Sequence, residues 1–261
     1  MPELPDLEVF KTNIYNRISS KILVDLEVYN PRKMITPKKT LLDALAGREL
    51  LGIERIGKEL YFDFGDKKTI AAHLMLSGRI SIVKTAKEVE AIGYKIFSMS
   101  FAEETVVFSD AGGLCSVKLS PPVSKTPDAF GDAFSLEYFL GIAKKKQMSN
   151  IKAFLICQKV VKGIGNAYAD EILWAARISP KSFVGKIPEP QMAVLYEAIG
   201  SVLRDAITSI KQISPDIISG EERSFLKVHN RKLKKTETGY PVIVEKIASK
   251  TTYYTEEQVF Y

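Results

Sequence analysis

The first half of the chain consists of short apolar runs separated by polar turns, after an opening segment with helical spacing. The apolar positions Leu7, Phe10, Ile14 and Ile18 predict a first helix. Runs rich in Val, Ile, Tyr and Phe then predict strands over residues 22–29, 50–56, 60–64, 69–75, 80–83, 95–101, 105–108 and 116–119. Regular short strands of this kind indicate a β-sandwich or a barrel.

The second half of the chain has a different periodicity. Segment 120–132 has no periodicity and contains three prolines, two aspartates and a glycine, which predicts a linker. Apolar stripes then predict helices over 136–145, 151–161, 166–176 and 190–210, and the tail 225–261 is strand-like again. We expect domains over residues 1–131, 132–224 and 225–261.

Composition narrows the class of protein. With 261 residues, 46% of them hydrophobic, the chain can bury two modest cores. Its net charge of +6 favours a polyanionic partner. No apolar segment approaches the roughly 20 residues that span a bilayer. The start of the sequence also lacks a secretory signal, so we expect a cytoplasmic protein with no membrane partner.

Metal binding is judged from the same counts. The thiol and imidazole groups are those of Cys115, Cys157, His73 and His229, and their spacing matches no zinc motif. The sequence therefore predicts no metal site and no cofactor.

A glycine-rich motif interrupts the helical half, within residues 158–173. Gly163 and Gly165 permit a tight turn, and Asn166 is suited to cap the helix that follows. Free backbone N–H groups and the positive end of the helix dipole make such a turn an anion site, where a phosphate can bind. The alternative is an ordinary glycine-rich connection between two packed helices.

The N-terminus carries a second candidate group. If Met1 is removed, Pro2 presents a secondary amine that can attack a sugar carbon and form a cationic iminium directly. A terminal amine has an ordinary pKa of roughly 8, so it is neutral at pH 7 far more often than a lysine. The alternative is that Pro2 and Pro5 only stiffen the start of the first helix.

Both motifs resemble those of the formamidopyrimidine-DNA glycosylase and endonuclease VIII family. Residues 1–8 are similar to its opening motif, and residues 151–180 to its helix-two-turn-helix. Residues 56–60 and 73–78 resemble two further signatures, so the resemblance spans nearly the whole chain. It implies an α+β fold, in which an N-terminal helix and a two-layered antiparallel β-sandwich precede a helical domain and a C-terminal hairpin finger.

The resemblance also implies roles for single residues. Pro2 would be the nucleophile and Glu3 the acid or base that manages protons. Lys58 would contact the lesion phosphate and lower the pKa of the Pro2 amine. Asn166 would hold backbone phosphate. Glu3 could instead be a helix-start carboxylate, and Lys58 an ordinary surface lysine.

One position of the opening motif departs from the family pattern. Asp6 stands where the family usually has the longer glutamate. It is a candidate for proton handling, and the alternative is a partner for the helix dipole.

The tail resembles the zinc finger of the family without its thiolates. The expected cysteine positions, around Lys235, Thr238, Thr255 and Gln258, hold other residues, which predicts a zincless finger held by apolar and aromatic side chains. Lys250 falls where the finger normally supplies an arginine, so the phosphate contact loses its bidentate geometry. Arg231 belongs to a basic cluster that either contacts the DNA backbone or is only a solvated face.

The loop 110–115 departs most from the resemblance. Gly113 and Leu114 occupy the places of an arginine and a phenylalanine that the family inserts into the gap left by an extruded nucleotide, and Leu76 replaces a methionine. Leu76 and Leu114 could still wedge apolar bulk into the base stack. The hydrogen-bond donor that would contact the base opposite the lesion is therefore absent. The segment 213–223 is also shorter than the family loop that covers bulky oxidised purines, which argues against 8-oxoguanine as a substrate.

The sequence therefore predicts a bifunctional DNA glycosylase and abasic-site lyase of base excision repair, acting through β,δ-elimination. We expect a monomer whose partner is damaged DNA, including single-stranded DNA. Two alternatives are a catalytically weak protein that binds lesions or abasic sites on the same scaffold, and a basic RNA-binding protein, which only the charge supports.

Overall fold

The computed structural model describes residues 1–34, 36–122 and 124–261. The chain divides into two units, one of Met1–Val123 with Lys211–Glu221 and one of Ser124–Ile210 with Glu222–Tyr261. The boundaries expected at residues 131 and 224 stay a prediction. No helix among the described residues is long and apolar enough to cross a membrane.

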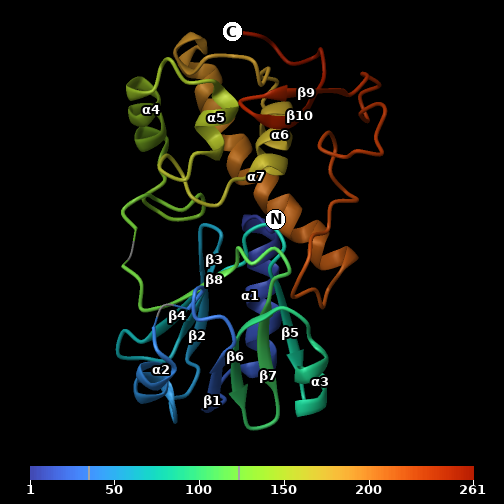
Figure 1. Ribbon diagram of the computed structural model, residues 1–261. Coiled ribbons are helices and arrows are strands. Elements are labelled where there is room, and N and C mark those ends of the chain that lie inside the picture. The colour runs from blue at the N-terminus through green and yellow to red at the C-terminus, as the bar shows by residue number, and fades with distance from the viewer. Residues whose placement is uncertain (35, 123) are drawn as a thin grey trace. The chain divides into compact units, whose positions relative to one another are not determined.

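Two four-stranded antiparallel sheets form the first unit (Figure 1). One has the order β1 (Leu23–Val28), β6 (Lys95–Phe101), β7 (Thr105–Ser109) and β5 (Arg79–Val83). The other has the order β2 (Gly52–Ile56), β3 (Glu59–Asp63), β4 (Thr69–His73) and β8 (Ser116–Leu119). All pairings are antiparallel, which confirms the predicted sandwich.

Helix α1 (Leu4–Ile18) shares one core with both sheets. Its predicted apolar stripe is at most 1% exposed and packs in a cluster with residues of both sheets. Within that cluster the rings of Phe62 and Phe108, from opposite sheets, meet edge to face with centroids 5.8 Å apart. The sandwich therefore fixes the helix that follows the candidate nucleophile Pro2 along the chain.

Two short helices of this unit, α2 (Lys38–Leu45) and α3 (Ala86–Ala91), were not predicted. Helix α3 has a detectable signal, because Thr85 and Glu88 form a reciprocal capping box at its start. Its pattern of apolar residues gives no such signal, because no residue of α3 is buried. Apolar periodicity therefore could not reveal it.

The second unit is helical and ends in a hairpin. Its elements are α4 (Leu136–Lys145), α5 (Ile151–Ile156), α6 (Asn166–Ala175), the 3-10 turn η1 (Val184–Lys186), α7 (Glu189–Ile213, whose last residues belong to the first unit), β9 (Ile243–Ile247) and β10 (Lys250–Tyr254). Helix α5 is shorter than predicted because Cys157 is extended. Asn166 is not the N-cap of α6 as expected: Gly165 takes that position and Asn166 is the first helical residue.

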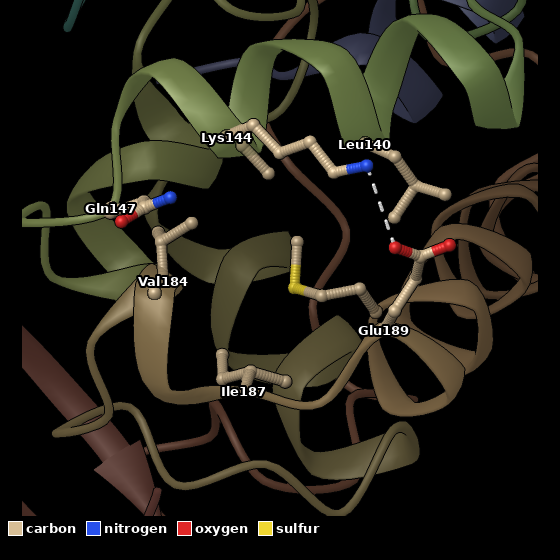
Figure 2. Close-up of a pocket in the computed structure, with 9 residues that line it drawn as sticks. Leu140, Lys144, Gln147, Val184, Ile187 and Glu189 are labelled. Carbon is tan, nitrogen blue, oxygen red and sulfur yellow. Dashed lines mark ion pairs between the residues drawn. The ribbon is translucent and has the colours of Figure 1, made fainter.

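A small cavity of about 130 Å³ lies among α4, η1 and the start of α7 (Figure 2). Its walls are mostly apolar, and its one ion pair joins Lys144 Nζ to Glu189 Oε2 at 3.6 Å. None of the predicted site residues lines it. This cavity is therefore not the candidate site.

Candidate active site

The start of α1 holds three of the predicted residues in fixed positions. Pro2 is buried, Glu3 is 4% exposed and Asp6 is fully buried. Glu3 is the N-cap of the helix, and its backbone N–H donates to Asp6 Oδ2 at 2.8 Å. Asp6 therefore lies in the first turn of α1, where its alternative role as a partner for the helix dipole requires a carboxylate. The amine of Met1 bonds the carboxylate of Glu221.

Lys58 lies in the two-residue turn between β2 and β3, rather than within a strand. Gly57, which precedes it, has a φ of 63°, a conformation that glycine adopts at little cost. Arg55 ties this turn to α1: its Nε donates to Glu8 Oε2 at 2.8 Å and its Nη1 to the Gly57 carbonyl at 3.0 Å. The opening motif and the lysine motif are thereby joined by a direct contact.

The Glu8 carboxylate at this junction is charged in the folded protein. Burial raises its pKa, but hydrogen bonds from Lys11 and Arg55 outweigh that effect, and the pKa lies below its ordinary value. The ion pair with Arg55, whose side chain is 4% exposed, therefore stays formed at neutral pH.

A cavity of about 770 Å³ opens beside Pro2 within the first unit. Its walls are formed by the turn between β4 and β5, the turn between α3 and β6, and the end of β7 with the loop that follows it. Gly220 and Glu221 also line it. A volume of this order is typical of a small-molecule pocket of about 300–1,000 Å³. The predicted nucleophile thus borders a space large enough for a nucleobase.

Asp110 organises two of these turns, and sequence reasoning did not single it out. Its Oδ1 accepts hydrogen bonds from Ser77 Oγ at 2.5 Å and from the Gly112 N–H at 2.9 Å, and its Oδ2 accepts the N–H groups of Leu114 and Cys115, both at 2.6 Å. Burial raises the pKa of Asp110, yet these bonds hold it below its ordinary value. An aspartate followed by small residues was the available signal.

The two candidate wedge residues project from these turns. Leu76, which lines the cavity, is 63% exposed, and Leu114, in the loop after β7, is 42% exposed. Their neighbours Met75 and Gly113 have φ values of 54° and 60°, so both turns have left-handed backbone. Both leucines are therefore available to a ligand, as their predicted role requires.

The glycine turn of the second unit is fixed from inside by Gln158. Its Oε1 accepts the Gly163 N–H at 3.0 Å, and its Nε2 donates to the carbonyls of Ile156 and Ile164 at 2.9 and 2.8 Å. Gly163 has a φ of 104°, which only glycine adopts readily. The turn therefore presents a fixed backbone at the start of α6.

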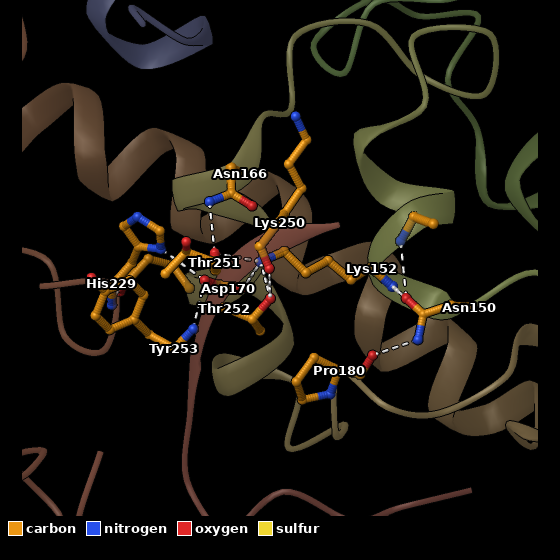
Figure 3. Close-up of polar contacts among 12 residues, drawn as sticks. Asn150, Lys152, Asn166, Asp170, Pro180, His229, Lys250, Thr251, Thr252 and Tyr253 are labelled. Carbon is orange, nitrogen blue, oxygen red and sulfur yellow. Dashed lines mark hydrogen bonds and ion pairs between the residues drawn. The ribbon is translucent and has the colours of Figure 1, made fainter. Parts of the chain in front are cut away.

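Asn166 connects this turn to the C-terminal hairpin (Figure 3). Its Nδ2 donates to the carbonyl of Thr251 at 2.9 Å, and its Oδ1 is buried without a hydrogen bond to any described residue. Thr251 follows Lys250 in β10, so the position of the exposed Lys250 is coupled to that of Asn166. Arg231 is also exposed in this unit.

Below Asn166 lies a buried ion pair that no sequence pattern revealed. Lys152 Nζ lies 2.7 Å from Asp170 Oδ1, both side chains are fully buried, and Lys152 Nζ also donates to Thr252 Oγ1 at 2.7 Å (Figure 3). The other oxygen of Asp170 lies 2.7 Å from His229 Nδ1 and accepts the Tyr253 N–H at 2.9 Å. These contacts fasten the hairpin to α5 and α6.

The finger is closed by a carboxylate where the resemblance placed a zinc ion. Glu257 Oε2 accepts hydrogen bonds from Thr238 Oγ1 at 2.7 Å, Thr255 Oγ1 at 3.1 Å and Trp174 Nε1 at 3.3 Å, and the carboxylate pairs with Arg177. Thr238 and Thr255 are two of the four expected cysteine positions.

The other two expected cysteine positions differ from each other. Gln258 accepts the Thr255 N–H at 2.8 Å and donates to the Ile178 carbonyl at 2.8 Å, whereas Lys235 is exposed. The described residues contain no group of three or more His, Cys, Asp or Glu side chains that could hold a metal ion.

Comparison with known proteins gives the family. The model of the formamidopyrimidine-DNA glycosylase N-terminal domain matches residues 1–115, and that of its helix-two-turn-helix domain matches residues 126–216. The formamidopyrimidine-DNA glycosylase of Carboxydothermus hydrogenoformans is 31% identical over 238 residues, 88% of this chain and 89% of that protein. This chain belongs to the formamidopyrimidine-DNA glycosylase family. The relative from Enterococcus faecalis is 30% identical over 275 residues, 97% of this chain and 95% of that protein.

Solved structures of family members have the same fold. A complex of wild-type Lactococcus lactis Fpg with DNA containing an oxidised pyrimidine is 25% identical and has a TM-score of 0.85, covering 97% of this chain and 98% of that one. A complex of the same protein with DNA containing an abasic site has a TM-score of 0.85 at 24% identity, with coverage of 97% and 98%.

Proposed function

We propose that this protein is a bifunctional DNA glycosylase and abasic-site lyase of base excision repair. The observation that carries the proposal is Pro2, buried beside a cavity of about 770 Å³ and followed by the buried carboxylate of Glu3. Family membership supports glycosylase chemistry, and the Lactococcus lactis relative was solved with DNA containing an oxidised pyrimidine. We infer that damaged DNA is the substrate here.

The chemistry begins when Met1 is removed and the Pro2 amine is freed. The nitrogen lone pair attacks C1′ of the damaged nucleotide, the bond from C1′ to the base breaks, and the base leaves with a proton. Glu3 protonates the ring oxygen as the sugar opens, which leaves a cationic iminium. Loss of a C2′ proton then expels the 3′ phosphate, and loss of the C4′ proton from the resulting conjugated iminium expels the 5′ phosphate.

Phosphate contacts position the strand for this attack. Lys58 is assigned to the lesion phosphate, and the N-terminus of α6, with Gly163, Gly165 and Asn166, binds backbone phosphate through N–H groups and the helix dipole. Lys250 and Arg231 add exposed positive charge in the same unit as α6. The nucleotide must leave the stack to reach Pro2, with Leu76 and Leu114 filling the gap.

Reductive trapping tests the proposal. Wild-type protein is mixed with an oligonucleotide carrying one abasic site, borohydride is added, and the covalent adduct is measured. Pro2→Gly should lower the trapping rate at least about tenfold, because the secondary amine is lost, and acetylation of the N-terminus should abolish trapping.

Pro5→Gly is the matched control, because Pro5 is also buried at the start of α1 but carries no free amine in the proposed mechanism. If Pro5→Gly impairs trapping as much as Pro2→Gly, the two prolines only shape the helix start and the nucleophile assignment is wrong.

The same assay decides the alternative of a catalytically weak lesion-binding protein. The absence of an arginine and an aromatic side chain from Gly113–Leu114 favours that alternative. It predicts tight binding to abasic DNA with no borohydride adduct, whereas the proposed lyase gives both.

A further inference from the structure

Tyr94 is an aromatic side chain held in an unfavourable conformation at the mouth of the cavity beside Pro2. It is 74% exposed, more than any other aromatic residue that the structure describes. Its φ of 54° lies in the left-handed region, which bulky residues rarely adopt. Both features oppose folding stability, so their presence beside a predicted nucleophile indicates a functional constraint.

The backbone around Tyr94 is held on both sides. The carbonyl of Tyr94 accepts the N–H of Asp110 at 3.0 Å, which joins it to the loop that shapes the cavity. Lys95 Nζ donates to the carbonyls of Val89 at 3.2 Å and Ile92 at 2.9 Å, which fixes the turn after α3. The ring therefore projects from a rigid support rather than from a loose loop.

The other walls of the cavity carry no aromatic ring. The remaining described lining residues are proline, leucine, isoleucine, serine, glycine, alanine, arginine, aspartate and glutamate. Loop 110–115 also contains no aromatic residue. A pocket that holds an extruded base normally reads it partly by stacking against an aromatic or apolar face. Tyr94 is the residue able to supply an aromatic face here.

We propose that the ring of Tyr94 is the surface on which the extruded nucleobase stacks while Pro2 attacks its sugar. This inference rests on the proposed function and assigns Tyr94 as a substrate-contacting residue. Stacking accepts any flat base, because every base has a π-face, so the site would hold damaged pyrimidines without a dedicated hydrogen-bond pattern.

The test compares Tyr94→Asn with Tyr94→Phe. Asparagine tolerates the left-handed backbone and removes the ring, whereas phenylalanine keeps the ring and removes only the hydroxyl. Two substrates are used: a duplex with one 5-hydroxyuracil, and the same duplex with an abasic site, which has no base to stack. Thermal melting of each variant reports whether it is folded.

The expected result separates the two substrates. Tyr94→Asn should lower single-turnover excision of 5-hydroxyuracil at least about tenfold, while Tyr94→Phe stays within about threefold of wild type. Borohydride trapping on abasic DNA should be unchanged in both variants. If Tyr94→Asn excises the base as fast as wild type, or loses abasic trapping to the same degree, the stacking inference is wrong.

A failure of the proposed function gives a different pattern, because the wild type itself then forms no adduct with abasic DNA. Two results would prevent excision from reporting on stacking: no adduct of wild type with abasic DNA, or no excision of 5-hydroxyuracil by wild type. Stacking is then measured by the fluorescence of 2-aminopurine placed at the lesion position. A brighter complex with Tyr94→Asn than with wild type and Tyr94→Phe supports stacking on the ring, and equal brightness overturns it.

Discussion

Asp110 is a single carboxylate that sets the shape of two turns beside Pro2. It accepts one hydroxyl and three backbone N–H groups, and it is 3% exposed. A side chain at Gly112 would disturb this arrangement, because its Cβ would lie 2.7 Å from Ser77 Oγ, which donates to Asp110. The turns that carry Leu76 and Leu114 therefore depend on this one charge.

We expect Asp110→Asn to lower the free energy of unfolding by about 2 kcal/mol, the typical contribution of hydrogen bonds to a charged group. The folded pKa of Asp110 is lowered, so its stabilisation is complete above the ordinary aspartate pKa of about 3.9 and is lost as the pH falls through the folded pKa. The difference in urea unfolding between the two proteins should therefore be constant at and above about pH 5, and it should shrink progressively as the pH falls below about 4 toward the lowered pKa.

The matched control is Asp66→Asn, because the side chain of Asp66 is 79% exposed in a surface pair with Arg48. It should change stability by less than about 0.5 kcal/mol. A constant difference between Asp110→Asn and wild type at all pH values would show that the charge of Asp110 does not stabilise these turns.

At the scale of residues, candidate site residues could be predicted from the sequence where their role depends on residues adjacent to them along the chain. Pro2 and Glu3 belong to the start of a helix, and Gly163 has the left-handed conformation expected of a tight turn. The ion pair of Lys152 with Asp170 was not predictable, because Lys152 lies within an apolar helical stripe and its partner is on another helix. Only the tertiary fold shows that such a lysine is buried.

At the scale of elements, the finger combines a hairpin with a hydrogen-bonded closure. Glu257 joins Thr238 and Thr255 to Trp174 and Arg177 of the helical part. Its carboxylate thus joins two of the four positions at which the resemblance expects cysteine. The strands β9 and β10 are joined by a two-residue turn, Ala248 and Ser249, with φ values of 50° and 61°.

We expect Glu257→Ala to destabilise the finger by roughly 2–3 kcal/mol, since it leaves the buried Thr255 hydroxyl and the buried Trp174 indole without their acceptor. Glu256→Ala is the control, because Glu256 is adjacent and exposed. Thermal melting and protease sensitivity of residues 225–261 measure the effect. Equal melting temperatures for the two variants would mean that the carboxylate does not close the finger.

The same closure predicts a protein without tightly bound zinc, whose melting temperature does not change with a chelator. Elemental analysis of the folded protein checks this. One equivalent of zinc, with unfolding on chelation, would show that other ligands have replaced the cysteines.

Element boundaries were predicted well where apolar periodicity is strong. The bounds of α4, β6 and β8 are those predicted. The two strands end on an apolar residue, and α4 ends on the basic residues Lys144 and Lys145, which are typical of a helix C-terminus. Helix α5 ends five residues early because residues 157–161 form a turn in which Val160 and Val161 are still buried. Burial alone does not distinguish a helix from a packed turn.

At the scale of the whole molecule, the predicted order of sandwich, helical part and hairpin is confirmed. The placement of residues 211–221 with the first unit was not predicted, because it depends on contacts distant in sequence. Asn13 Nδ2 donates to the carbonyls of Pro215 at 2.7 Å and Ile217 at 2.8 Å, and Ser219 Oγ accepts the Ile80 N–H at 3.1 Å. Helical periodicity gives no information on such contacts.

We expect excision to depend weakly on the base opposite the lesion and steeply on salt. Gly113 supplies no side chain to the orphaned base, so affinity relies on phosphate contacts, which are indifferent to sequence and weaken with salt. Rates are compared for one lesion opposite each of the four bases and in a single strand, at fixed salt. A duplex preference above about a hundredfold, roughly 2.7 kcal/mol, would mean that another loop supplies the wedge.

The double variant Gly113→Arg with Leu114→Phe is the matched comparison. A Cβ at Gly113 meets nothing within 4 Å, although its φ of 60° costs some stability. This variant should gain opposite-base discrimination relative to wild type.

The closure of the finger by Glu257 also affects how the finger responds to oxidation. Thiolates that hold a metal are oxidised stepwise to sulfenic and sulfinic acids, and each oxidation removes a ligand. The hydroxyls of Thr238 and Thr255 and the carboxylate of Glu257 do not undergo this chemistry. The hairpin that carries Lys250 therefore keeps its shape under the same oxidising conditions that damage DNA bases.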